Sequence, residues 1–324
     1  MRQVRIDSYG DPGVLHVVEV PDPEPGPDQV VVRTAAAGIT FVETQIRAGR
    51  PPWPGPRPEL PLVLGNGDEG EIVAVGADNH DPSLPGRRVV TATGGFGGYA
   101  DYVAVKAADV IAVPDGLELG QAVALLADGR TALALARAAA ITPADRVLVT
   151  AAAGGVGSLL VQLARTAGAK HVIAAASSER KLAVTRELGA DVTVDYTRAG
   201  WADEVRATTG GVDVAFDGVG GGIGQAALGL IAPGGRFLQY GAAGGAWADV
   251  DDVGRRGVTL IAGHTLVRSP EDNRQLVEQG LAAAVAGRLR PVIGQTFPLS
   301  RAADAHAAIE ARKTIGKTLL IPES

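Results

Sequence analysis

The sequence predicts an α/β protein in which a doubly wound, six-stranded parallel sheet is inserted into a β-rich domain. The first observation is a glycine-rich turn at residues 151–157, between an apolar run at 146–150 and a helix-like segment at 158–165. The second is the alternation of apolar and helical segments that begins near residue 121. The third is the pattern before residue 120, where short β-like runs are separated by turns about every ten residues.

The composition is typical of a globular protein of about two domains, because 324 residues with 46% hydrophobic content suffice for large cores. The chain has no cysteine, which excludes disulfides, thiol catalysis and cysteine-ligated zinc. Its net charge of -6 argues against nucleic-acid or anionic-membrane partners. Residues 1–6 resemble a strand rather than a presequence, and no uncharged run approaches the ~20 residues of a membrane span. We expect a cytoplasmic protein.

The β-rich domain begins the chain. Its strands are expected at residues 1–6, 14–18, 29–33, 70–76, 88–91 and 99–105. One helix is expected from Thr40 to Ala48. The proline-rich segment 51–58 lacks backbone N–H groups that a helix or a central strand needs, so it is predicted to be a loop. Within it, Trp53 is more consistent with a surface anchor than with a cover over a cleft.

The inserted domain alternates strands with helices. We expect strands at 146–150, 171–176, 192–196, 212–216, 236–240 and 258–262, and helices at 131–140, 158–165, 179–188, 201–208 and 223–231. The final part, with a helix at 271–286 and a strand at 317–321, shows no further strand–helix–strand succession. It is therefore expected to return to the first domain. The predicted domains are 1–121 with 267–324, and 122–266, with the active cleft between them.

The glycine-rich turn predicts a dinucleotide-binding, or Rossmann, unit. Gly154 and Gly157 fill the second and third glycine positions of the G-x-G-x-x-G pattern, whereas Ala152 replaces the first. A strand, a glycine turn and a helix present backbone N–H groups and a helix dipole to a pyrophosphate. The strand at 171–176 follows at the right distance for a βαβ unit. A glycine-rich turn of some other parallel-sheet protein is the alternative.

Ligands of open parallel sheets bind beyond the carboxyl ends of the strands. The residues expected there are Gly154, Gly155, Val156, Gly157, Ser177, Ser178, Tyr196, Asp217, Gly218, Gly241, Ala242, Gly263 and His264. An NAD site places a carboxylate after the second strand, but here Ser177 and Ser178 are followed by Arg180 and Lys181. This pattern favours the 2′-phosphate of NADPH over NADH, although Glu179 weakens the inference and both cations suit a solvated first helical turn.

Several phrases resemble those of one family. They are residues 38–49, 98–103, 151–157, 189–196, 216–221, 232–236 and 316–322. On these phrases the chain resembles, over essentially its full length, the zinc-free quinone oxidoreductases, the zeta-crystallin-like branch of the medium-chain dehydrogenase/reductase superfamily. The resemblance implies that the β-rich domain is GroES-like, so that the expected fold is a doubly wound Rossmann domain inserted in a GroES-like domain.

The resemblance also implies that the catalytic zinc of the superfamily is missing. Asn66 and Gly67 replace the histidine and glutamate of its zinc motif, Thr40 replaces a cysteine ligand, and Ala127 replaces a later ligand. No metal is therefore expected. The remaining chemistry is hydride transfer from NADPH to a quinone, or to an alkene conjugated to a carbonyl, with fixed donors stabilising the charge that develops on oxygen.

The resemblance assigns roles to individual residues. Phe41 and Thr131 are expected near the nicotinamide, where Thr131 either donates a hydrogen bond or only occupies a helix N-terminus. Ser178, Lys181 and Tyr196 are expected around the adenosine phosphate. Gly241, Ala242, His264 and Arg312 are expected closer to the pyrophosphate or nicotinamide. His264 is a weak candidate for the general acid, because a histidine at the end of a strand is more often structural and solvent can supply the proton.

The acceptor pocket is expected to differ from that of the family. Thr40, Glu43 and Arg130 are its candidate lining residues, and Thr40 to Glu43 replaces the usual Asn-x-x-Asp. Arg130 either pairs with Glu43 or Asp128, or attracts an anionic substrate. The function expected is an NADPH-dependent quinone oxidoreductase. The alternatives are a zinc-free alkenal, enone or enoyl reductase, and a nucleotide-binding protein without catalysis. The apolar strand at 258–262 suggests a homodimer.

Overall fold

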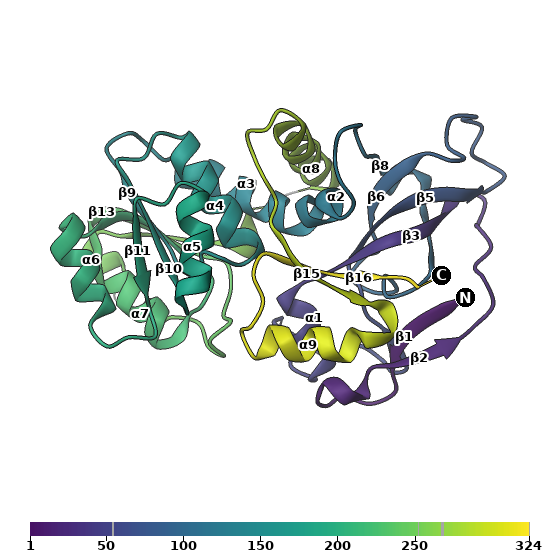
Figure 1. Ribbon diagram of the computed structural model, residues 1–324, viewed down its shortest axis with the longest axis horizontal. Coiled ribbons are helices and arrows are strands. Elements are labelled where there is room, and N and C mark those ends of the chain that lie inside the picture. Colours follow the sequence, from purple (N-terminus) through teal and green to yellow (C-terminus); the bar gives the residue numbers. More distant parts are fainter. Residues whose placement is uncertain (54, 252, 267–268, 324) are drawn as a thin grey trace. The chain divides into compact units, whose positions relative to one another are not determined.

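The computed structural model describes residues 1–53, 55–251, 253–266 and 269–323, and its chain forms two compact units. The first unit comprises Met1–Ala127 with Val292–Ser324, and the second comprises Asp128–Pro291. Figure 1 follows the chain through both units. These limits differ from the sequence-based boundaries at 121/122 and 266/267, and residue 267 lies outside the described residues. Among the described residues, no helix has the length and apolar character that crossing a membrane requires. The cytoplasmic location stays a prediction.

The first unit is built on two sheets. A small antiparallel sheet has the order β2-β1-β4, and a larger one has the order β15-β16-β3-β5-β6-β8, with β7 also paired to β3. The strands are β1 (Arg2–Ile6), β2 (His16–Glu19), β3 (Gln29–Ile39), β4 (Leu62–Val63), β5 (Gly67–Val75), β6 (Arg88–Ala92), β7 (Tyr102–Lys106), β8 (Ile111–Ala112), β15 (Ile293–Pro298) and β16 (Lys317–Ile321). The predicted β-rich domain is therefore present.

Strand β3 organises the first unit, because it pairs with β5, β7 and β16 along its length. Val30 and Val32 lie in one apolar core with residues of β5, β6 and β7. Ala37 and Ile39, further along the strand, lie in a second core. The strand ends at Ile39, where helix α1 (Phe41–Arg47) begins. The predicted helix at 40–48 is thus found within one residue at each end.

The C-terminal segment differs from the expectation. Strand β15 is parallel to β16, and helix α9 (Ala302–Glu310) lies between them in sequence, so the segment is a strand–helix–strand unit. The prediction of no further such succession was wrong. Only half-buried or exposed residues make up β15, and Gly294, Gln295 and Thr296 give it no apolar alternation. The sequence therefore offered little sign of a strand there.

The second unit contains the predicted six-stranded parallel sheet among its described residues, in the order β11-β10-β9-β12-β13-β14. This is the doubly wound dinucleotide-binding order. The strands are β9 (Arg146–Val149), β10 (His171–Ala176), β11 (Val192–Asp195), β12 (Val212–Asp217), β13 (Ile231–Gln239) and β14 (Thr259–Ala262). The helices between them are α4 (Gly155–Thr166), α5 (Glu179–Glu187), α6 (Trp201–Thr209) and α7 (Gly221–Gly229). Figure 1 shows β9, β10 and β11 side by side, with α4 and α5 beside them.

Two further helices pack together in the second unit. Helix α3 (Arg130–Ala139) contacts α8 (Pro270–Val285), and Arg137 of α3 forms an ion pair with Asp272 of α8 at 2.9 Å. Ser269 caps α8 by accepting a hydrogen bond from the backbone N–H of Asp272. The sequence-based division assigned α8 to the returning domain, but its packing on α3 places it in the second unit.

The helical segment before α3 is longer than expected. A short helix α2 (Gln121–Ala124) leads into a π-helical turn at Leu125–Gly129, which continues directly into α3. Sequence periodicity predicted only the part from residue 131. The proline-rich loop is described at residues 51–53 and 55–58 and has no helix or strand there, as predicted. Trp53 is 40% exposed, which is consistent with a surface position.

Candidate functional site

The glycine-rich turn connects β9 to α4 with little space for side chains. Ala151 has a left-handed backbone with φ of 50°, and Gly154 occupies the N-cap position of α4. A Cβ added at Gly157 would lie 2.3 Å from the carbonyl oxygen of Ala151, which is backbone and cannot move aside easily. The third glycine of the motif is therefore required by close packing of the helix on the turn. The N-terminus of α4 therefore lies at the carboxyl end of the parallel sheet, directly after β9.

The carboxylate of Asp128, which was not assigned to the turn from the sequence, lies at this helix N-terminus. A Cβ added at Gly155, the first residue of α4, would lie 2.0 Å from Oδ2 of Asp128. Asp128 is part of the π-helical turn before α3. The partial positive charge of the helix N-terminus stabilises a carboxylate there. Asp128 therefore adds negative charge beside the turn that is expected to bind pyrophosphate.

The residues after β10 combine hydroxyl groups with a cation. Ser178 is the N-cap residue of α5, and Ser177 lies between it and the strand. The ammonium group of Lys181, in the first turn of α5, donates a hydrogen bond to Oγ of Ser177 at 3.1 Å. Glu179 forms an ion pair with Arg186, on the same helix. The carboxylate of Glu179, which weakened the prediction of NADPH over NADH, is therefore engaged by Arg186.

Tyr196 follows β11 and is more buried than its predicted role suggests. Its backbone N–H donates to the carbonyl oxygen of Ala176, the last residue of β10, so its backbone lies close to the serine pair in space. The side chain is 8% exposed and belongs to the apolar core of the second unit. Most of this residue therefore packs in the core rather than facing solvent.

The carboxyl end of β12 is held by several buried hydrogen bonds. Asp217 is fully buried, and its Oδ1 accepts hydrogen bonds from Oγ1 of Thr150 at 2.7 Å and from two backbone N–H groups. Burial raises the pKa of Asp217, and these hydrogen bonds lower it. A Cβ added at Gly218 would lie 2.6 Å from the ring of Tyr240, whose hydroxyl donates to the carbonyl oxygen of Thr150. These contacts hold the ends of β9, β12 and β13 together.

The next two strand ends hold the remaining predicted residues of this unit. Gly241 and Ala242 follow β13, and a Cβ at Gly241 would lie 2.9 Å from the carbonyl oxygen of Gly218. His264 lies in a short 3-10 helix after β14 and is exposed. The predicted cofactor residues from Gly154 to His264 thus all occur at the carboxyl end of the sheet or immediately after it.

The start of α3 carries Arg130 and Thr131. Nη1 of Arg130 donates a hydrogen bond to Oδ1 of Asn273 on α8 at 2.6 Å, and its buried Nε has no hydrogen-bond partner in the described part of the chain. Burial lowers the pKa of Arg130, and the charge of Asp128 raises it. Asp128 was expected from the sequence as one candidate partner of Arg130, but Asn273 was not identified. Thr131 is half-buried in the first turn of α3.

Four predicted residues belong to the first unit. Thr40 is the N-cap residue of α1, and Phe41 is its first, half-buried residue. Glu43 is buried, and its Oε2 accepts hydrogen bonds from the backbone N–H of Thr40 and, at 3.2 Å, from its hydroxyl. Arg312 follows α9, is exposed, and has a left-handed φ of 55°. The local sequence Thr-x-x-Glu explains the reciprocal capping of α1.

Glu43 lies in a buried polar cluster that sequence reasoning missed. Asp68 of β5 is fully buried. Burial raises the pKa of Tyr99, and the neighbouring Glu43 and then Asp68 raise it further. The hydroxyl of Tyr99 is hydrogen-bonded to Nε2 of His306 at 2.9 Å. These residues come from four distant parts of the sequence, so no local motif could have identified them.

Burial controls the protonation of this cluster. It raises the pKa of Glu43 to about 7, against lowering contributions from Thr40 and Lys317. Burial, reinforced by the charge of Glu43, raises the pKa of Asp68 well above its ordinary value. Burial lowers the pKa of His306 to about 3. The cluster therefore favours neutral forms of groups that are charged at the protein surface.

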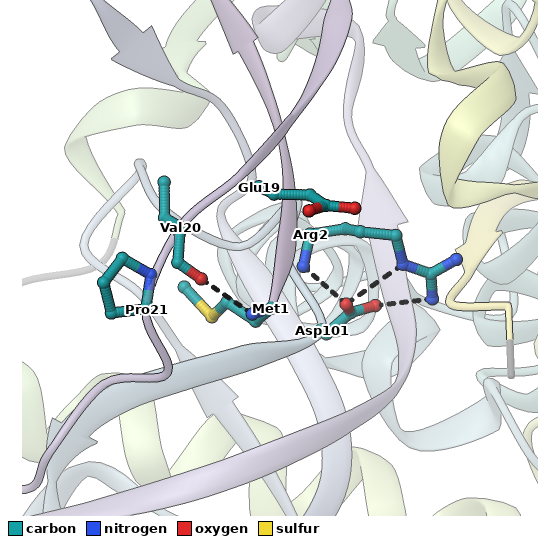
Figure 2. A pocket seen from close by; sticks show the side chains of 6 residues that line it. All are labelled: Met1, Arg2, Glu19, Val20, Pro21 and Asp101. Atoms are coloured by element: carbon teal, nitrogen blue, oxygen red, sulfur yellow. Dashed lines mark hydrogen bonds and ion pairs between the residues drawn. The ribbon is translucent and has the colours of Figure 1, made fainter.

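A separate pocket lies on the surface of the first unit, with a volume of about 510 Å³. Figure 2 shows its lining residues, Met1, Arg2, Glu19, Val20, Pro21 and Asp101. Two interactions join residues that line this pocket to one another. Arg2 pairs with Asp101, and the N-terminal ammonium group donates to the carbonyl oxygen of Val20. This pocket contains none of the predicted site residues.

The residues at the sheet edge of the second unit fit a phosphorylated dinucleotide coenzyme. Gly157 has no Cβ where the backbone of the turn is crowded, so α4 begins close to the strand, and Gly155 has none where the side chain of Asp128 lies. Lys181 places a cation beside Ser177, where a ribose phosphate would be recognised. Within the described residues, no group of three or more His, Asp or Glu side chains is arranged to hold a metal ion.

Comparison with known proteins identifies the family. Residues 155–281 match the family of zinc-binding dehydrogenases, and residues 26–115 match the GroES-like domain of alcohol dehydrogenases. The chain is 32% identical to a quinone oxidoreductase of Pseudomonas aeruginosa, with 99% of each chain covered. It belongs to the quinone oxidoreductase branch of the medium-chain dehydrogenase/reductase superfamily.

Two further relatives of this quinone oxidoreductase branch bear on cofactor and substrate. A structure of Escherichia coli quinone oxidoreductase complexed with NADPH matches with a TM-score of 0.90 and 27% identity, covering 99% of this chain and 100% of that chain. A 2-haloacrylate reductase of Burkholderia sp is 36% identical, with 98% of each chain covered. The chain is thus similar both to proteins named for quinones and to one named for a haloacrylate.

Proposed function

We propose that this chain is an NADPH-dependent oxidoreductase that reduces quinones by hydride transfer without a metal ion. The observation that carries the proposal is the similarity to quinone oxidoreductases over the full length, combined with a closely packed glycine-rich turn that keeps the second and third glycines of the dinucleotide motif. NADPH supplies the hydride when it is bound. The protein's own residues bind and orient the coenzyme, exclude water and provide hydrogen-bond donors for the acceptor.

The coenzyme residues proposed are those at the carboxyl end of the sheet. Gly154, Gly155, Val156 and Gly157 would face the pyrophosphate, and Ser177, Ser178 and Lys181 would face the adenosine phosphate. Gly218, Gly241, Ala242 and His264 complete this strip, with Tyr196 supporting it from the core. Phe41, Thr131 and Arg312 are proposed to contact the nicotinamide half.

Catalysis without zinc is part of the proposal. Asn66, Gly67 and Thr40 stand where the superfamily has zinc ligands, and none of them supplies an imidazole, thiolate or carboxylate. A quinone suits this site, because its carbonyl groups accept the charge of an incoming hydride without a Lewis acid. Thr40, Glu43 and Arg130 are proposed to line the acceptor pocket.

Reduction of a conjugated alkene is the second candidate. It is favoured by the 36% identity to a 2-haloacrylate reductase, which exceeds the 32% identity to the quinone oxidoreductase of Pseudomonas aeruginosa. An acrylate is an anion, and Arg130 is a cation whose buried Nε has no partner among the described residues. The guanidinium group would therefore suit a carboxylate-bearing alkene better than a neutral quinone.

An acceptor panel tests the proposal. Purified protein is mixed with NADPH and a benzoquinone, an alkenal, 2-chloroacrylate or no acceptor, and NADPH absorbance is followed. Quinone-dependent oxidation supports the first function, and oxidation only with an alkene supports the second. Binding of NADPH without oxidation by any acceptor would instead indicate a nucleotide-binding protein without catalysis. Dialysis against a chelator should leave the activity unchanged.

A further inference from the structure

Two carboxyl groups of the buried cluster around Glu43 are incompletely hydrogen-bonded within the described residues. Oε1 of Glu43 and Oδ2 of Asp68 are both buried and have no hydrogen-bond partner within the described part of the chain. By contrast, Glu69 of the same strand as Asp68 is equally buried but fully paired, with Arg88 and with the backbone N–H groups of Gly120 and Val123. Burial without such partners, as at Glu43 and Asp68, raises the free energy of the charged form of a carboxyl group.

The charged and titratable groups that face Glu43 come from every surrounding element. Asp68 of β5, Lys317 of β16 and Tyr99 before β7 interact with Glu43 itself, and Tyr99 in turn contacts His306 of α9 and feels the charge of Arg47 of α1. Arg47 pairs with Glu310, and Tyr99 and His306 are kept neutral by burial. Lys317, which is also buried, lowers the pKa of Glu43, but burial outweighs this contribution, so charge on both carboxyl groups at once is unfavourable.

The two carboxyl groups have different surroundings. Asp68 faces a single hydroxyl, that of Thr34 at 3.5 Å, so it is the group held neutral. Glu43 accepts hydrogen bonds from Thr40 and faces Lys317, and both contacts stabilise its charged form. Glu43 is thus the acid that can lose and regain a proton, and its pKa of about 7 agrees with this.

Thr40 connects the buried cluster to the surface of the first unit. Glu43, Asp68 and Tyr99 are at most 1% exposed, whereas Thr40 is half-buried and reaches the surface of the first unit. Its hydroxyl lies 3.2 Å from Oε2 of Glu43, within hydrogen-bond reach. A hydroxyl both donates and accepts, so it can pass a proton between a buried acid and a group outside.

We propose that Glu43 holds the proton that the reduced acceptor takes up, and that the hydroxyl of Thr40 passes it on. Reduction of a quinone by hydride leaves a hydroquinone monoanion that needs one proton. The O–H bond of Thr40 breaks as the new O–H bond of the acceptor forms, and the proton of Glu43 replaces it on Thr40. Glu43 is left as a carboxylate and regains its proton from solvent. This inference rests on the proposed function.

The first test needs no coenzyme. Infrared difference spectra of the free protein between acidic and basic pH should show loss of the carbonyl band of a protonated carboxylic acid near neutral pH. The band should be missing in Glu43→Gln and present in Asp68→Asn and in Glu71→Gln, a matched control at a surface ion pair of β5. A band that survives in Glu43→Gln and disappears in Asp68→Asn would overturn the assignment.

The second test measures turnover. Glu43→Gln keeps the capping hydrogen bond but cannot release a proton, so it should lower kcat about a hundredfold with NADPH affinity unchanged. Thr40→Val should behave alike and Thr40→Ser should retain most activity. In the wild type kcat should fall as pH rises through neutrality, because the ionised acid cannot donate, and this fall should vanish in Glu43→Gln. Wild-type pH dependence in Glu43→Gln, or full activity in Thr40→Val, would overturn the relay.

The two tests separate this inference from the proposed function. If the wild type oxidises NADPH with a quinone but Glu43→Gln does the same at every pH, only the relay fails. If the infrared band titrates as expected but no acceptor is reduced, the proposed function fails and the relay with it, while the buried proton on Glu43 remains.

Discussion

The ammonium nitrogen of Lys181 lies 3.1 Å from the hydroxyl oxygen of Ser177, directly after the second strand of the parallel sheet. This pair places a cation and a hydroxyl where a coenzyme's ribose phosphate is recognised. Lys181→Ala should therefore weaken NADPH binding about tenfold, since hydrogen bonds to charged groups contribute roughly 1.5–3 kcal/mol. NADH binding should change little. Titration calorimetry with both nucleotides checks this, with Lys170→Ala as an exposed control, and an unchanged NADPH/NADH ratio would refute it.

The turn should not tolerate a side chain at Gly157. Gly157→Ala places a Cβ 2.3 Å from the carbonyl oxygen of Ala151, so helix α4 must shift away from the strand. We expect a lower Tm and loss of most NADPH affinity. Gly222→Ala is the matched control, because Gly222 lies in the first turn of α7 with no atom within 4 Å of an added Cβ. Its Tm should stay level or rise, since alanine favours helix by about 1 kcal/mol. Equal behaviour of the two variants would contradict the packing argument.

Asp128 should oppose the coenzyme's charge. Its carboxylate lies against Gly155 at the N-terminus of α4, where the pyrophosphate is proposed to bind. Asp128→Asn removes a like charge and should tighten NADPH binding about fivefold at low salt, an effect that salt should reduce. Fluorescence titration of NADPH at two ionic strengths measures it. Weaker binding in this variant would show that the carboxylate supports the turn rather than opposing the coenzyme.

Acid should destabilise the first unit through His306. Burial lowers its pKa to about 3 from an ordinary value of 6.5, so the unfolded chain takes up this proton first as the pH falls. Stability is therefore lost as the pH drops from about 6.5 towards 3, by about 2 kcal/mol at pH 5 from this group. His306→Gln should lose less stability over that range. Denaturant unfolding of both proteins at pH 7 and pH 5 gives the difference, and parallel losses would exclude this role for His306.

The edge strand β14 should mediate a homodimer. It pairs with β13 on one side, and Leu260 on it is 40% exposed. Leu260→Lys should shift the protein from dimer to monomer in light scattering after size-exclusion chromatography. Val285→Lys, at an apolar position on α8 that is 50% exposed, should leave the mass unchanged. A monomeric wild type would remove the basis for this prediction.

The nucleotide-binding half of the fold was predictable because its signals are local. Strand β10 occurs at the predicted residues 171–176, since a fully buried strand needs an uninterrupted apolar run. The order of the strands follows from the handedness of their connections. In contrast, β15 carries no alternation, and α9 was hidden in an alanine-rich stretch without a strong polar face. Packing on distant elements, rather than local preference, decides such segments.

The residues of the candidate site likewise divide into those that a local motif identifies and those that it does not. Gly157 and Lys181 were identifiable because the motif and its spacing lie within one βαβ unit. Asp68 and His306 were not, because Asp68 meets Glu43 and His306 meets Tyr99 only when segments distant in the sequence fold together. A polar residue in a strand or helix gives no sign in the sequence that it will be buried next to another.

Calorimetric titration of the purified protein with NADPH and with NADH tests the central claim most directly, because everything proposed here depends on a coenzyme held at the carboxyl end of the sheet. The account predicts one site per chain, with NADPH bound more tightly than NADH and the preference lost in Lys181→Ala. Absence of heat with both nucleotides, confirmed by equilibrium dialysis, would contradict it.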